Sequence, residues 1–112
     1  MRPLSDTERQ VLALTLSTDF PGAAELRAQA ESARVVQECQ CGCPTVDLAV
    51  SEDVLLAAVT SRTPINAVVD GVEGGGLIVF VDDGRLSGLE FYAAVDPMPR
   101  EFPALEKIHP YL

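Results

Sequence analysis

Two runs of β-prone residues joined by Asp83-Gly84 constrain the fold of this chain more than any other feature of its sequence. The runs cover residues 77–82 and 86–93. An Asp-Gly pair between two such runs is typical of a two-residue turn whose twist suits an antiparallel hairpin. Residues 77–82 carry apolar side chains at both odd and even positions, so both faces of this strand are expected to be covered. The pattern predicts an antiparallel sheet with this strand near its centre.

Three more strands are expected before this hairpin, at residues 34–39, 45–50 and 67–72, because β-branched and alternating apolar residues recur there. Residues 51–64 lack a clear period and are expected to be irregular. The tail, residues 96–112, holds four of the prolines and is expected to be irregular apart from one turn near residues 104–108.

Two helices are expected ahead of the strands, at residues 6–17 and 21–33. Ser5 and Glu8 have the spacing of a capping box at the start of the first helix, and Pro21 suits the first turn of the second. Helices followed by strands, without alternation, predict an α+β fold. We therefore expect one domain over residues 1–112, with two N-terminal helices packed on an antiparallel meander of about five strands.

The charge of the chain is strongly acidic and uneven. It has 8 basic and 17 acidic side chains and a net charge of -9, while its 47% hydrophobic content is too high for a disordered chain. Residues 35–99 alone carry two basic and ten acidic side chains. This balance argues against nucleic acid or an anionic membrane as a partner and favours a basic protein.

The sequence predicts a cytoplasmic protein. The first residues lack the apolar run of a signal peptide, and the longest apolar run, Val54 to Val59, is far shorter than the roughly 20 residues of a membrane span. The three cysteines lie within five residues of one another and so do not link distant segments. We expect them to be reduced.

These cysteines, Cys39, Cys41 and Cys43, are the most distinctive candidate site. Alternate residues of an extended chain share a face, so their thiols can converge on zinc or another soft metal ion. Zinc prefers four ligands, and His109, the single histidine, or a carboxylate would have to complete the set. Two alternatives stay open: a strained, easily reduced disulfide, and thiols that merely pack as small apolar side chains.

No catalytic motif accompanies this cluster. His109 has no neighbour in the sequence that would orient it as a base, and Gly74-Gly75-Gly76 lacks the lysine of a phosphate-binding loop. We therefore predict that the protein is not an enzyme and needs no organic cofactor.

Three stretches, residues 19–27 (DFPGAAELR), 39–48 (CQCGCPTVDL) and 81–90 (VDDGRLSGLE), resemble a family of small proteins from high-GC Gram-positive bacteria. The resemblance implies a single α+β domain and brings no activity, cofactor or catalytic residue with it. The hairpin at residues 82–90 is also similar to strands of immunity proteins that neutralise toxins. The leading hypothesis is thus a non-catalytic interaction protein of inhibitor or immunity type, and the alternative is a metal- or redox-responsive module.

Overall fold

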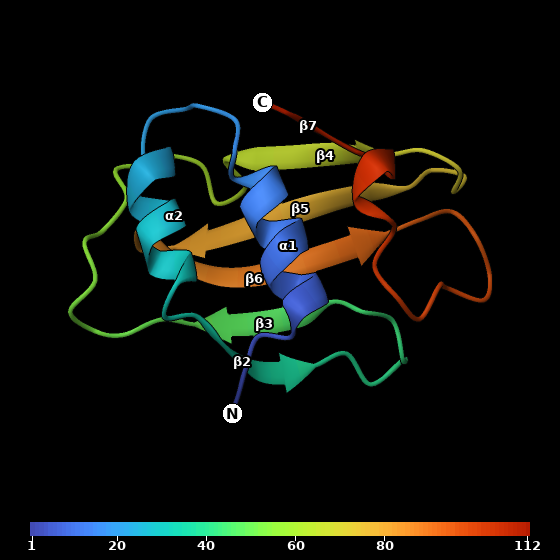
Figure 1. The fold of residues 1–112 in the computed structure, drawn as a ribbon, viewed down its shortest axis with the longest axis horizontal. Helices are drawn as coiled ribbons and strands as arrows, with labels where there is room; N and C mark the ends of the chain where they lie inside the picture. Colours follow the sequence, from blue (N-terminus) through green and yellow to red (C-terminus); the bar gives the residue numbers. More distant parts are fainter.

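The computed structural model describes residues 1–112 and gathers seven strands into one antiparallel sheet (Figure 1). The strands are β1 (Arg2–Pro3), β2 (Arg34–Glu38), β3 (Val46–Ala49), β4 (Ile65–Val69), β5 (Gly76–Asp82), β6 (Arg85–Tyr92) and β7 (Ile108–Tyr111). Their order is β1-β2-β3-β6-β5-β4-β7. The predicted α+β class is confirmed. The predicted meander of about five strands is wrong in number and in order, because β3 pairs with β6 rather than with β4.

Both helices, α1 (Asp6–Thr15) and α2 (Ala23–Ala30), lie on the same face of the sheet (Figure 1). The predicted capping box of α1 is confirmed: the Ser5 hydroxyl accepts from the Glu8 backbone N–H at 3.1 Å, and the Glu8 carboxylate accepts from the Ser5 N–H at 2.8 Å. Both helices are shorter than predicted. The second one starts late because Gly22 has a left-handed backbone, with a φ of 94°, which a helix does not allow.

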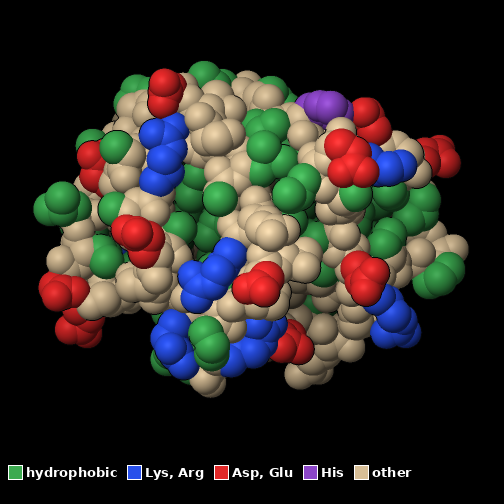
Figure 2. Space-filling model, viewed as in Figure 1, with side chains coloured by type: hydrophobic (Ala, Val, Ile, Leu, Met, Phe, Trp, Pro, Cys, Tyr) green, Lys and Arg blue, Asp and Glu red, His purple; other side chains and the backbone are tan.

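The core fills the layer between these helices and the sheet. Its fully buried large side chains come from both layers: Val11, Leu12, Leu16 and Leu26 from the helical part, and Ile65, Leu77, Val79, Leu86 and Leu89 from the strands. Burial of this apolar surface is the main force that joins the two layers. On the helical side, basic and acidic side chains surround an apolar centre (Figure 2).

The opposite face of the sheet carries no helix (Figure 1). In β5, Leu77 and Val79 are buried toward the helices, whereas Ile78 and Phe80 point the other way and stay partly exposed. The predicted central place of this strand is confirmed. The expectation that both of its faces are covered is wrong, because its second face is apolar without having a layer of structure on top of it.

The tail departs most from prediction. It contains a single helical turn, η1 (Leu105–Lys107), as expected, but then forms β7, which pairs with β4 at the edge of the sheet. Pro110 is tolerated in this strand because an edge strand leaves one row of backbone groups unpaired. Residues 51–64 are irregular, as predicted. None of the helices combines the length and the apolar character needed to cross a membrane.

One buried polar side chain ties the layers together at the Asp83-Gly84 turn. That turn has the predicted geometry, with φ of 52° and 77°. Gln29 on α2 is 1% exposed, and its amide donates to the carbonyls of Leu55 and Gly84, each at 2.8 Å. Its amide oxygen accepts from the Leu86 N–H at 2.9 Å. The helix is thereby attached to the hairpin by hydrogen bonds as well as by apolar packing.

Candidate metal centre in the β2–β3 loop

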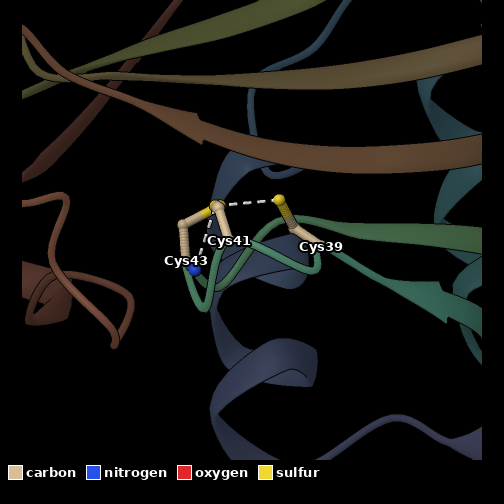
Figure 3. A group of neighbouring side chains, drawn as sticks. All are labelled: Cys39, Cys41 and Cys43. Carbon is tan, nitrogen blue, oxygen red and sulfur yellow. Dashed lines mark hydrogen bonds between the residues drawn. The ribbon is translucent and has the colours of Figure 1, made fainter.

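The loop between β2 and β3 gathers the three cysteines on one side of the chain (Figure 3). The Cys39 N–H donates to the Thr45 carbonyl at 3.2 Å, and the Gly42 N–H donates back to the Cys39 carbonyl at 3.3 Å. Gly42 has a φ of 90°, so the chain turns sharply between Cys41 and Cys43. The predicted convergence of the three side chains is therefore present, but it arises from a tight loop and not from an extended strand.

The sulfurs lie close enough together to share one ion. All three Sγ atoms are within 4.8 Å of one another, and those of Cys39 and Cys41 are 2.9 Å apart. Because a metal–thiolate bond is about 2.3 Å long, two sulfurs on one ion lie roughly 3.8 to 4.0 Å apart. The Cys39 and Cys41 sulfurs are about 1 Å closer than this, so they would have to move apart to share an ion.

The three thiols have different acidities. Burial opposes ionisation of Cys43, but hydrogen bonds from Cys41 and Thr45 outweigh it and lower the pKa of this thiol to about 7. The hydrogen bond with Cys41 raises the pKa of Cys39 to about 11. One thiolate is thus available near neutral pH, and a metal ion that binds it would favour ionisation of the others.

A pocket of about 420 Å³ adjoins the cluster, and Cys39 and Cys43 form part of its wall. The Arg2 guanidinium on another wall binds Glu38 at 2.9 Å and Glu8 at 2.8 Å, so its charge is already paired. Hydrogen bonding to Arg2 in turn lowers the pKa of the Glu8 carboxyl. The pocket is therefore lined by thiols and by fixed charges.

Arg100 supplies the unpaired cation of this pocket. Its guanidinium lies over Gly42, where a Cβ would be only 2.5 Å from Nη1, and it forms no ion pair with a carboxylate. Neither Arg2 nor Arg100 was predicted as part of the site. The only sequence signal for them is charge, because both are far from the cysteines along the chain and reach the loop through the fold.

His109 does not join the thiols. It lies on β7, one edge strand of the sheet, whereas β2 and β3 lie near the other edge. Strands β6, β5 and β4 separate β3 from β7. Its Nε2 is 2.7 Å from Asp70 Oδ2, and its side chain is 55% exposed. The structure thus brings together Cys39, Cys41 and Cys43 from the predicted site and leaves the imidazole elsewhere.

Compared with known proteins, the chain matches no protein-family model, no curated protein and no solved structure. The resemblance drawn from the three sequence stretches therefore stays a prediction, and the site has to be interpreted from its own chemistry.

Proposed function

We propose that this protein is a soft-metal-binding module that holds one monovalent copper ion through Cys39, Cys41 and Cys43. The observation that carries the proposal is the meeting of three sulfurs within 4.8 Å in a single short loop. Thiolate sulfur is a soft ligand that selects copper(I), zinc or iron–sulfur clusters over hard ions.

The number of ligands favours copper(I) over zinc. Structural zinc sites have four protein ligands in a tetrahedron, whereas this cluster offers three sulfurs and His109 lies across the sheet. Copper(I) is satisfied by three thiolates in a plane. Three thiolates and one monovalent ion leave two net negative charges, which the unpaired guanidinium of Arg100 beside Gly42 would partly balance.

Titration of the reduced protein with copper(I), without oxygen and against a copper(I)-chelating dye, tests the proposal. We expect one ion per chain, a thiolate-to-copper absorption band in the ultraviolet, and binding much tighter than that of zinc in a parallel titration. Cys41→Ser should keep the fold, weaken copper binding at least about tenfold, and remove the metal-linked rise in melting temperature.

His109→Ala is the matched control, since it removes the single imidazole of the chain, which lies away from the thiols. It should leave copper affinity unchanged. The proposal fails if Cys41→Ser binds copper as tightly as the native chain, or if zinc competes equally. It also fails on a combination of two results: thiol titration of protein purified without reductant finds a single free thiol, and the protein takes up no metal after it is reduced. That combination would favour the redox alternative, in which Cys39 and Cys41 form a disulfide; their Sγ atoms are 2.9 Å apart.

A further inference from the structure

Two of the three thiols, those of Cys39 and Cys41, form a distinct pair within the cluster. Their Sγ atoms are 2.9 Å apart, whereas Cys43 contacts this pair through its backbone N–H, which donates to the Cys41 sulfur at 3.4 Å (Figure 3). A disulfide joins two sulfurs at about 2.05 Å, and two thiolates on one metal ion lie roughly 3.8 to 4.0 Å apart. The observed separation is therefore intermediate between that of a disulfide and that of a metal-bound pair.

The position of the pair allows its sulfurs to approach each other without disturbing the sheet. Both residues lie in the loop between β2 and β3, outside the strands. The two backbone hydrogen bonds of this loop are made by Cys39, Gly42 and Thr45, so neither of them holds Cys41. Cys41 is also exposed, whereas Cys39 is half-buried. A bond between the two sulfurs thus requires movement of an exposed side chain and not of the fold.

We propose that this pair is a redox switch of the copper site, in which a disulfide between Cys39 and Cys41 prevents copper binding. The inference rests on the proposed function, because it describes how binding at the same three thiols is regulated. The disulfide consumes two of the three ligands and leaves Cys43 as a single thiolate. Since a metal site depends on its full set of deprotonated ligands, oxidation and copper binding exclude each other.

The oxidant is a low-molecular-weight disulfide, RS–SR, which reacts by thiol–disulfide exchange. The exposed Cys41 thiolate attacks one sulfur of RS–SR and forms a mixed disulfide, and the RS⁻ that leaves takes up the proton that Cys41 had lost. The Cys39 thiolate then attacks the Cys41 sulfur, the bond from Cys41 to SR breaks, and a second RS⁻ leaves with the proton of Cys39. Two protein thiols are thereby oxidised to one disulfide, and RS–SR is reduced to two molecules of RSH.

The test adds oxidised glutathione, without oxygen, to the reduced and metal-free protein. Free thiols are then alkylated with one reagent and the thiols recovered by reduction with a second, so that mass spectrometry of fragments assigns a label to each cysteine. We expect the first label on Cys43 and the second on Cys39 and Cys41. Cys43→Ser should form the disulfide as fast as the native chain, whereas Cys39→Ser should form one at least about tenfold more slowly.

Copper(I) binding, measured against the same chelating dye, is the second readout. The oxidised protein should take up no copper, and reduction should restore the binding of one ion per chain. Copper(I) added before the oxidised glutathione should slow disulfide formation at least about tenfold, because the ion occupies the attacking thiolates.

The switch and the proposed function fail on different results. If the reduced protein binds no copper, the proposed function fails and the switch fails with it, whatever the disulfide map shows. If the reduced protein does bind copper, the switch alone is overturned by any of four results. These are the absence of a disulfide, a disulfide between Cys41 and Cys43, unchanged copper binding after oxidation, and equal rates of disulfide formation in the two variants.

Discussion

The connection between β5 and β6 and the connection between β2 and β3 both reverse the chain between antiparallel neighbours, but they are held in different ways. The β5–β6 turn consists of Asp83 and Gly84, and Gln29 reaches it from the core. The Ala57 N–H also donates to the Gly84 carbonyl at 2.9 Å. This turn is held by two other parts of the chain, α2 and the irregular segment 51–64.

The β2–β3 loop is anchored only at its last residue, where the Thr45 hydroxyl accepts from the Phe91 N–H at 3.1 Å and donates to the Phe91 carbonyl at 3.3 Å. Its internal contacts are two backbone hydrogen bonds and the contacts among the cysteines, and Cys41 is exposed. Nothing in the packing of the domain requires three thiols in this loop. The residues of the β5–β6 turn therefore stabilise the fold, whereas the cysteines of the β2–β3 loop are available to bind a ligand.

Removal of the buried amide at the first connection is expected to have the largest effect on stability. Gln29→Ala leaves the Leu86 N–H and the Leu55 carbonyl without their partner and removes one of the two hydrogen bonds to the Gly84 carbonyl. Because unsatisfied buried polar groups are costly and a cavity also forms, we expect the free energy of unfolding to fall by about 3 kcal/mol in urea denaturation.

Gln10→Ala is the matched control, because Gln10 is an exposed glutamine on α1. It should change the free energy of unfolding by no more than about 0.5 kcal/mol. Equal effects of the two variants would show that the β5–β6 turn does not depend on its anchor, and the contrast between the two connections would disappear.

This glutamine also shows why the sequence predicts only part of the fold. The Asp83-Gly84 turn and the Ser5–Glu8 capping box were predictable, since each depends on neighbouring residues alone. Gln29 was missed because a polar residue beside an alanine stripe gives no local sign that carbonyls far along the chain will meet it. The pairing of β3 with β6 and the addition of β7 depend in the same way on long-range packing.

The candidate site was likewise predictable only where it depends on residues close together in the sequence. The spacing of Cys39, Cys41 and Cys43 predicted that their sulfurs meet, because three residues so close together have few other arrangements. The spacing did not indicate Arg2 and Arg100, which the fold brings to the pocket from distant segments. Local chemistry was therefore predictable, but the charged surroundings of the thiols were not.

Replacing the left-handed glycine of each connection by alanine is expected to have the next largest effects on the free energy of unfolding. Gly84 and Gly42 both have left-handed backbones, with φ of 77° and 90°, so alanine is strained at either position. At Gly84 the new Cβ would meet the Ala57 carbonyl at 3.0 Å, whereas at Gly42 it would meet only the flexible end of Arg100. We expect Gly84→Ala to cost about 2 kcal/mol and Gly42→Ala about 1 kcal/mol in thermal or urea unfolding.

If Gly42→Ala lowered the free energy of unfolding more than Gly84→Ala, the β2–β3 loop would be held more firmly than its few hydrogen bonds indicate. Copper(I) affinity gives a second readout on the same pair. Gly42→Ala should weaken binding by disturbing the loop, and Gly84→Ala should leave it unchanged as long as the protein is folded.

The smallest expected effect concerns pH and the wall of the thiol pocket. The hydrogen bond from Arg2 to Glu8 is the main cause that lowers the Glu8 pKa, and burial opposes it. Because the pKa of this carboxyl is lower in the folded than in the unfolded state, its contribution is complete above the ordinary value of 4.5 and is lost as the pH falls below it. Glu8→Gln removes that contribution, at a cost of about 1 kcal/mol at neutral pH. The difference in unfolding free energy between native and variant protein should therefore shrink from neutral pH to about pH 3. A difference that stays constant over this range would show that Glu8 acts through packing, so that the pocket wall is held by shape and not by the Arg2–Glu8 ion pair.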